Sequence, residues 1–240
     1  MSRERLDKII AARANLSRRE ARDLIRRGRV LVNGAVVTAP ETPADAETDT
    51  LTVDGTPLPA GRFAYLMLHK PAGVLSASRD GKTPTVIDLV PPELKRKGLF
   101  PAGRLDKDTT GFVLLTDDGG FAHRIVSPKN HVYKTYEVRL TRPVSEAAVQ
   151  TLENGMTLED GTVLLPAFAR LLDGSGTLVS LEICEGKFHQ VKRMFAALGS
   201  EVAALKRTSI GGLALDDSLP PGECRSITER ELQRIFEGRR

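Results

Sequence analysis

Residues 103–119 read GRLDKDTTGFVLLTDDG, a charged segment followed at once by an apolar run. The apolar run predicts a buried strand over residues 111–116, because its length suits a strand better than a helix. Side chains alternate along extended backbone, so Arg104 and Asp106 would project from the same side if residues 104–106 are extended. The segment then places a carboxylate beside a guanidinium, next to a buried strand.

Asp106 is the leading candidate for chemistry. Burial would oppose its ionisation, whereas the adjacent Arg104 would favour the charged form, so the pair can keep a nucleophilic carboxylate in a shielded site. An ordinary loop ion pair explains the spacing equally well, since structural ion pairs are common.

Two other motifs overlap this segment. Asp106 and Asp108 have the spacing of aspartate-dependent phosphatases, but those enzymes place the first Asp after a buried strand, and here residues 101–104 precede it. The same carboxylates resemble the start of a calcium loop, yet Thr110 and Asp117 stand where another ligand and the final Glu belong. We therefore reject calcium binding and rank a magnesium-dependent phosphatase last.

Strand and helix periods alternate on both sides of this segment. Strands are expected over residues 65–68, 111–116, 132–140, 162–172 and 177–183. Helices are expected after a Ser145 cap, from His189 to Leu198, and after the capping pair Thr228 and Glu231. Hairpin-like spacing dominates, so we expect an α+β fold with a mixed, mostly antiparallel sheet and helices packed against it.

Basic charge is concentrated at the N-terminus. Residues 1–34 hold ten Arg or Lys against four acids, whereas residues 35–62 hold five acids and one Arg. Such clustering is typical of a surface that contacts phosphates, although a solvated helix face gives the same pattern. The candidate nucleic-acid contacts are Arg5, Arg18, Arg19, Arg22, Arg26, Arg27 and Arg29.

The N-terminal residues also predict a compact unit of two helices and a hairpin. Ser2 is expected to cap a first helix with an apolar face over residues 6–10. Ser17 with Glu20 predicts a capping box for a second helix, which ends at Gly28.

A tight hairpin should follow, because Asn33 and Gly34 both tolerate positive φ and separate two short apolar runs. Residues 38–50 show neither a helical nor a strand period, and residues 55–61 add further breakers, so the domain boundary is expected near residue 60. We therefore expect an N-terminal domain with its linker over 1–60 and a second domain over 61–240.

The string LSRREARDLIRRGRVLVNG, residues 16–34, resembles the RNA-binding module of the ribosomal protein S4 family. In that family two helices and a hairpin present Arg and Lys to structured RNA. Such modules occur in several RNA-modifying enzymes and in ribosomal proteins, so the resemblance implies RNA binding and not a particular chemistry.

Four strings in chain order resemble the pseudouridine synthases that act on ribosomal RNA: AYLMLHKPAGVLSA (64–77), GRLDKDTTGFVLLTDDG (103–119), HVYKTYEVRL (131–140) and GKFHQVKRMFAALG (186–199). This resemblance implies isomerisation of a uridine in RNA: the N-glycosidic bond breaks, the uracil rotates, and it rejoins through carbon. The family's catalytic Asp lies in its GRLD motif, here Asp106, with Arg104 as its partner. Attack on the sugar and attack on the base both stay open, and no cofactor or metal is expected, since the reaction needs no redox or group transfer.

Two further residues are candidates for the active site. Tyr136 shares a strand face with Val138 and Leu140, and the family has a Tyr here that is thought to stack on the target base. A plain core Tyr also fits that position. Lys192 lies off the apolar stripe of its expected helix, where the family carries a basic residue near the active site, and a surface charge is the alternative.

Three other residues have weaker assignments. Arg193 is expected to contact the RNA backbone. Lys70 precedes a Pro71 turn and could contact a phosphate, although the turn alone explains it. His189 is expected to order the start of its helix and not to catalyse.

Composition favours a soluble, cytoplasmic protein. No apolar run approaches the length of a bilayer span, and the N-terminus alternates in charge where a secretory segment would be apolar. Cys184 and Cys224 lack metal-ligand spacing and are expected to be reduced, small core residues.

The leading functional hypothesis is a uridine isomerase for small-subunit ribosomal RNA, because SPKNHVYKTYEV (127–138) and HQVKRMFAALG (189–199) resemble that branch of the family. The alternatives are a large-subunit enzyme and a non-catalytic ribosome-assembly factor that uses only its basic module. The expected partner is ribosomal RNA or an assembling small subunit, with no membrane, and the expected state is a monomer.

Overall fold

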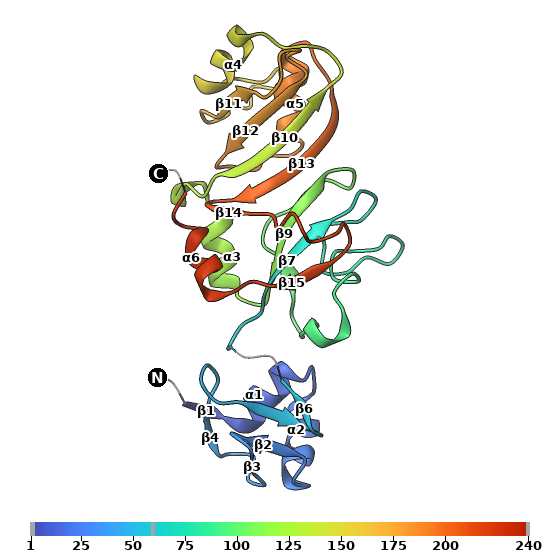
Figure 1. Cartoon of the computed structure of the whole chain (residues 1–240), viewed down its shortest axis with the longest axis vertical. Helices are drawn as coiled ribbons and strands as arrows, with labels where there is room; N and C mark the ends of the chain where they lie inside the picture. Colours follow the sequence, from blue (N-terminus) through green and yellow to red (C-terminus); the bar gives the residue numbers. More distant parts are fainter. Residues whose placement is uncertain (1–2, 59–60, 239–240) are drawn as a thin grey trace. The chain divides into compact units, whose positions relative to one another are not determined.

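The computed structural model describes residues 3–58 and 61–238 and divides into two compact units. The first unit is built from the N-terminal residues up to Tyr65 and also takes in residues 90–99 and 116–118. The remaining residues form the second unit (Figure 1). The domain boundary near residue 60 stays a prediction.

Two short helices open the N-terminal unit, α1 (Leu6–Arg13) and α2 (Arg18–Arg26). The capping box of α2 forms as predicted: the N–H of Glu20 donates to the Ser17 hydroxyl, and the N–H of Ser17 donates to the Glu20 carboxylate at 2.7 Å. Ser2, the predicted cap of α1, lies outside the described residues. Arg5 occupies the N-cap position of α1.

The predicted hairpin is confirmed. Strand β2 (Val30–Val32) pairs antiparallel with β3 (Ala35–Val36). Between them, φ is 52° at Asn33 and 82° at Gly34, the left-handed conformation that a tight hairpin turn requires.

Residues 38–50 show no strand period in the sequence but nevertheless contain a short strand. This segment and its continuation add three short strands to the unit: β4 (Pro43–Asp45) pairs with β1 (Arg3–Arg5), β5 (Leu51–Val53) pairs with β2, and β6 (Thr56–Pro57) pairs with β5. Such short strands cannot display a period of two. The turn between β5 and β6 could nevertheless have been predicted from the Asp54-Gly55 pair. Both residues have positive φ, like Asn33 and Gly34 in the first hairpin.

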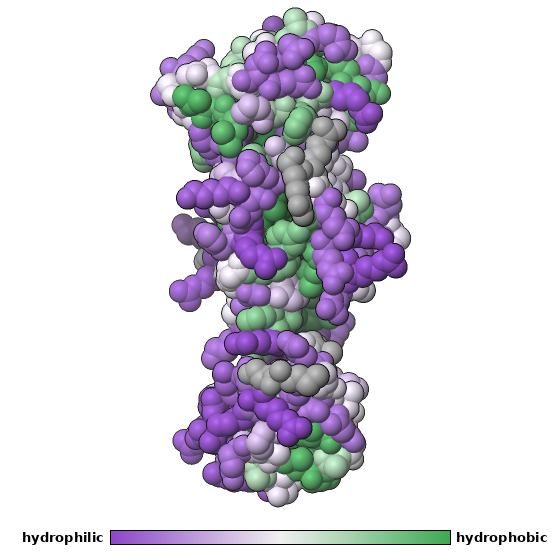
Figure 2. Space-filling model, turned by 90° about the vertical axis from the view of Figure 1, so that its left-hand side faces the viewer, coloured by the Kyte–Doolittle hydropathy of each residue, from purple (hydrophilic) through white to green (hydrophobic). Residues whose placement is uncertain are grey.

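Aliphatic side chains join the helices of this unit to its small sheet. The core consists of almost completely buried residues, among them Leu6, Ile10, Ala21, Ile25, Val30 and Leu51. The polar face of α2 remains outside, whereas α1 buries the charged side chains of Asp7 and Arg13 as well. The face of this unit that is visible in Figure 2 is largely hydrophilic.

One nine-stranded sheet forms the framework of the second unit (Figure 1). Its order is β11-β12-β10-β13-β9-β7-β15, with β14 paired to β13 and β8 paired to β9. The strands are β7 (Tyr65–Lys70), β8 (Phe100–Pro101), β9 (Thr110–Thr116), β10 (Lys134–Leu140), β11 (Phe168–Leu171), β12 (Leu178–Ile183), β13 (Val202–Ile210), β14 (Leu213–Ala214) and β15 (Cys224–Ser226). Strand β13 runs parallel to β9 and antiparallel to β10, and β12 also runs antiparallel to β10, which confirms the mixed, mostly antiparallel α+β class.

Helices accompany this sheet, and most begin at the predicted caps. They are α3 (Gly119–Val126), α4 (Glu146–Glu153), α5 (Gln190–Ala197) and α6 (Glu229–Arg234). The caps are Ser145 for α4, His189 for α5 and the Thr228–Glu231 capping box for α6. Helix α3 was not predicted, because the two glycines at its start are typical of a turn. It lies beside α6, where the rings of Phe121 and Phe236 meet at 5.5 Å between centroids.

Two strands differ from the predicted pattern. Only β11 forms within the predicted strand 162–172, and Pro166, which lacks an N–H for a strand ladder, precedes it. Strand β13 was missed because it carries Lys206 and Arg207 in its middle. Arg207 is nevertheless buried, and its Nε donates to the carbonyl of Phe112 at 2.7 Å.

The structure also bears on membrane insertion and on the two cysteines. None of the helices in the described ranges is both long enough and apolar enough for a bilayer crossing. Cys184 is buried, and burial raises the pKa of its thiol, whereas Cys224 is half-buried.

Gly111 permits the close contact between β9 and β13. Its φ is 102°, and a Cβ at this position would overlap the carbonyl oxygen of Arg207 and lie 2.7 Å from the Arg207 nitrogen. Residue 111 is paired with Arg207 in the parallel ladder, so the sheet requires glycine at this position.

We predict that Gly111→Ala lowers the free energy of unfolding by at least about 2 kcal/mol, because the methyl group meets backbone and the positive φ disfavours a Cβ. Gly119→Ala is the matched control: it lies in the first turn of α3, and a methyl group at this position would have no neighbouring atom within 4 Å. The control should stabilise by no more than about 1 kcal/mol. Urea unfolding measures both variants, and equal stability would contradict the role given to Gly111.

Candidate active site

Asp106 lies in the loop between β8 and β9, in a small pocket of about 70 Å³. The 104–109 loop, strand β10 and the segment that opens α5 all contribute to its lining. The four residues predicted as catalytic line this pocket together: Arg104, Asp106, Tyr136 and Lys192. The fold thus gathers residues that are far apart in sequence, while their catalytic roles stay predictions.

Lys192 is the cation beside Asp106. Its Nζ lies 3.3 Å from Oδ2 of Asp106 and donates to both carboxylate oxygens of Asp108 at 2.7 and 2.8 Å. Partial burial opposes the lysine charge, but the hydrogen bond to Asp108 and the charges of both carboxylates raise the pKa of Lys192 above its ordinary value. The same hydrogen bond holds the pKa of Asp108 below its ordinary value. Lys192 therefore remains protonated and fixes the position of Asp106.

The prediction of an Arg104–Asp106 pair is wrong. Arg104 is exposed and lines the pocket, but within residues 3–58 and 61–238 the ion pairs of Asp106 are to Lys192 and His189. The prediction assumed extended backbone over 104–106. Strand β8 ends at Pro101 and the chain bends at Gly103, whose φ is 93°, so no strand covers residues 104–106.

Lys70 is completely buried, which corrects its assignment as an RNA contact. Its Nζ donates to the carbonyls of Pro71 at 3.0 Å, Lys107 at 3.2 Å and Thr109 at 2.7 Å. Burial lowers the pKa of Lys70 to about 8, although the charges of Asp108 and Asp106 act in the opposite direction. The side chain is occupied inside the protein and supports the loop that carries Asp106.

Tyr136 faces the apolar side of β10, as predicted. It is 8% exposed, and Val138 and Leu140 on the same face are also buried. Its pocket neighbours Ile183 and Leu205 are apolar as well. The pocket thus combines an aromatic and aliphatic wall with a charged edge at Asp106 and Lys192.

His189 occupies the N-cap position of α5, as expected, but its side chain does not cap the helix. Its φ is 48°, and its Nε2 lies 3.7 Å from Oδ1 of Asp106. The ring stacks on Phe188, with 3.9 Å between the centroids, and Phe188 is 76% exposed. Sequence reasoning did not single out Phe188, a large apolar residue that precedes the N-cap position of α5.

The predicted RNA-binding arginines of the N-terminal unit are all exposed. Arg29 forms a two-point ion pair with Asp54, and Arg5, Arg18 and Arg22 contact Asp7. Arg19, Arg26 and Arg27 make no ion pair with any described residue. In the second unit, Arg193 is paired with Asp160 at 2.5 Å.

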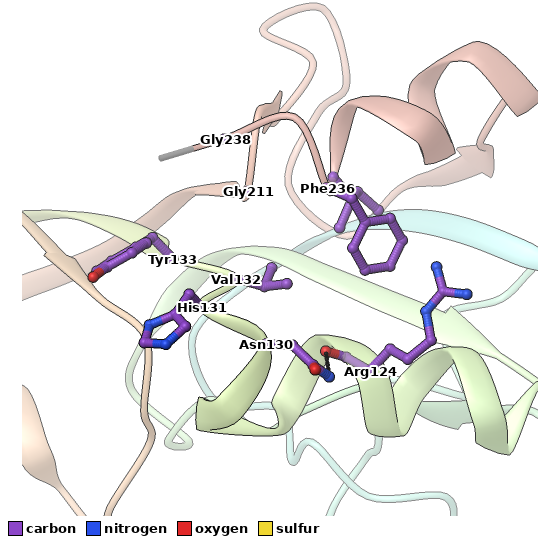
Figure 3. Close-up of a pocket in the computed structure, with 9 residues that line it drawn as sticks. Arg124, Asn130, His131, Val132, Tyr133, Gly211, Phe236 and Gly238 are labelled. Carbon is purple, nitrogen blue, oxygen red and sulfur yellow. Dashed lines mark hydrogen bonds between the residues drawn. The ribbon is translucent and has the colours of Figure 1, made fainter. Parts of the chain in front are cut away.

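A larger pocket of about 420 Å³ lies between the end of α3, the residues before β10 and the end of α6 (Figure 3). Arg124 and Phe236 approach each other on one side, with the guanidinium 4.3 Å from the ring centroid, and the side chains of Tyr133 and His131 lie on the other. No Asp or Glu is among its described lining residues, and it shares none of them with the Asp106 pocket. The larger pocket thus presents no carboxylate from the described residues that line it.

Comparison with known proteins identifies the class. Residues 64–197 match the RNA pseudouridylate synthase family, and residues 4–50 match the S4 domain. The chain belongs to the RNA pseudouridylate synthase family and is an enzyme of the isomerase class.

The chain is also similar to individual proteins of similar length. The chain is 46% identical over 97% of its length to an uncharacterized RNA pseudouridine synthase of Bacillus subtilis (strain 168), covering 98% of that protein. It is 44% identical over 95% of its length to the ribosomal small subunit pseudouridine synthase A of Pasteurella multocida (strain Pm70), covering 97% of that protein. A crystal structure of a pseudouridylate synthase superposes with a TM-score of 0.68 at 40% identity, over 97% of this chain and 99% of that one.

We predict that Lys70→Met lowers the free energy of unfolding by about 2 kcal/mol or more, because the buried carbonyl of Thr109 and the part-buried carbonyls of Pro71 and Lys107 lose their donor. Pseudouridine formation should fall about tenfold or more at temperatures where the variant is folded, since Asp106 is no longer held in place. Lys107→Met is the matched control, because Lys107 belongs to the same loop but its side chain is exposed. Thermal melts and single-turnover assays measure the two effects, and equal behaviour of both variants would contradict the support role.

Proposed function

We propose that the chain converts one uridine of small-subunit ribosomal RNA to pseudouridine, with Asp106 as the catalytic carboxylate. The observation that carries this proposal is the pocket in which Asp106, Lys192 and Tyr136 come together in a chain of this family. The relative named for the ribosomal small subunit supports the choice of RNA.

The chemistry requires a nucleophile or charge stabiliser beside the nucleotide. The C1′–N1 bond breaks, a C1′–C5 bond forms, the hydrogen on C5 leaves as a proton, and N1 gains one, so atoms and charge balance. The Asp106 side chain is 29% exposed and can be reached by a nucleotide that has left its stack. Lys192 lies beside this carboxylate, which can attack either the sugar or the base.

The pocket suits a pyrimidine. A uracil ring has two apolar faces and a polar edge, and Tyr136 with Ile183 and Leu205 supplies an apolar wall beside the charged groups. Stacking on Tyr136 would hold the base while the glycosidic bond is broken, without reading the surrounding sequence. Arg104, exposed at the pocket, is available to the phosphate or ribose of the same nucleotide.

Binding energy from elsewhere on the protein must offset the cost of unstacking. Flipping a nucleotide out of structured RNA costs a few kcal/mol. Phosphate contacts supply such energy through counterion release. We assign these contacts to Arg193 and to the exposed arginines of the N-terminal unit: Arg5, Arg18, Arg19, Arg22, Arg26, Arg27 and Arg29.

We assign RNA binding and catalysis to different domains of the chain. Residues 1–60 form the RNA-binding domain with its linker, and residues 61–240 form the catalytic domain. The enzyme acts as a cytoplasmic monomer on ribosomal RNA or on an assembling small subunit, without a cofactor.

We predict that the purified protein, with EDTA present, forms a single new pseudouridine in unmodified small-subunit ribosomal RNA and none in unmodified large-subunit RNA. Chemical mapping of pseudouridine at nucleotide resolution measures this, with RNA incubated without enzyme as the control.

The alternative outcomes separate chemistry from substrate. A product confined to large-subunit RNA would agree with the proposed isomerase chemistry but contradict the proposed small-subunit substrate. Absence of product on either RNA and on partly assembled small subunits would contradict the proposed function and favour a ribosome-assembly factor.

A further inference from the structure

Asp7 is a buried carboxylate surrounded by three arginines. Its side chain is 0% exposed at the start of α1. Arg18 donates from one terminal nitrogen to both of its oxygens at 2.9 Å, and Arg22 donates from Nε at 2.9 Å. Arg5 adds two longer hydrogen bonds, at 3.2 and 3.4 Å.

The charges of this cluster do not cancel. One carboxylate faces three guanidinium groups, so the cluster keeps a surplus of positive charge at the surface. Burial opposes the charge of Asp7, but the hydrogen bonds from Arg22, Arg5 and Arg18 outweigh it and hold the pKa of Asp7 well below its ordinary value. Asp7 therefore stays ionised at neutral pH and holds all three arginines.

The arginines remain available to another anion. Their side chains are 53%, 43% and 44% exposed for Arg5, Arg18 and Arg22. The contacts with Asp7 use Nε of Arg22 and one terminal nitrogen of Arg18, and no other acceptor for these two side chains occurs in the described parts of the chain. Arg18 and Arg22 are four residues apart on α2 and so lie on the same face of the helix.

We propose that Asp7 is the positioning residue of a preformed phosphate-binding site, in which Arg5, Arg18 and Arg22 contact neighbouring phosphates of the RNA backbone. This inference rests on the proposed RNA binding of the N-terminal unit. A free arginine loses much side-chain freedom when it binds a phosphate, whereas an arginine already held by Asp7 has lost that freedom in the folded protein. The planar guanidinium can contact Asp7 with one edge and a phosphate with another.

Asp7→Asn tests this inference because two physical effects predict opposite results. The substitution removes a negative charge from an RNA-binding surface, so long-range electrostatics alone predicts equal or tighter binding. Loss of positioning predicts weaker binding. We expect the Kd for a transcript of small-subunit ribosomal RNA to rise about tenfold at 0.1 M salt.

A second pair of variants keeps the test valid if Asp7→Asn disturbs folding. Arg18→Lys and Arg3→Lys both preserve charge at exposed positions of the N-terminal unit, but only Arg18 contacts Asp7. We expect Arg18→Lys to raise the Kd about threefold or more and Arg3→Lys to change it less than twofold. Circular dichroism and thermal melts of the full chain establish which variants are folded.

Two results would overturn the inference: a folded Asp7→Asn variant that binds RNA as well as or better than the parent, or equal effects of Arg18→Lys and Arg3→Lys. Failure of the isomerase proposal is distinguishable, because it appears as a wild-type protein that makes no pseudouridine whatever the binding measurements show.

Discussion

Two lysines hold the loop that carries Asp106, one from inside the protein and one from the pocket. Lys70 is buried and donates to the carbonyls of Lys107 and Thr109, while Lys192 contacts the carboxylates of Asp106 and Asp108. Backbone and side chains of the loop are thus fixed by separate cations. An enzyme that must place a carboxylate against one atom of a nucleotide needs such a fixed loop, because small displacements of the reacting groups are costly.

The sheet explains how Lys192 reaches this loop. Strand β13 follows α5 and lies parallel to β9, the strand that begins after the Asp106 loop. The parallel pairing depends on Gly111, whose missing side chain allows the backbone of Arg207 to approach. The position of the Asp106 pocket is therefore a consequence of strand order as well as of the GRLD segment itself.

Much of this organisation was predictable from local patterns. The α+β class, the capping boxes at Ser17 and Thr228 and the hairpin at Asn33 follow from short-range chemistry, and the structure contains them. The errors have long-range causes. Lys70 was assigned to the surface because lysine rarely loses all contact with water, and its burial depends on carbonyls that are distant in sequence. Arg104 was paired with Asp106 by assuming extended backbone, and β13 was missed because its buried Arg207 hides the apolar pattern.

The central claim is that Asp106 performs uridine isomerisation in this pocket. The most direct test uses ribosomal RNA that carries tritium on C5 of its uridines, because that hydrogen must leave when C5 bonds to the sugar. The parent protein and an Asp217→Asn control, whose exposed side chain does not line this pocket, should each release tritium equivalent to one uridine per RNA. Asp106→Asn should release none while binding RNA with nearly unchanged affinity. Release by Asp106→Asn at the parental rate would contradict the account.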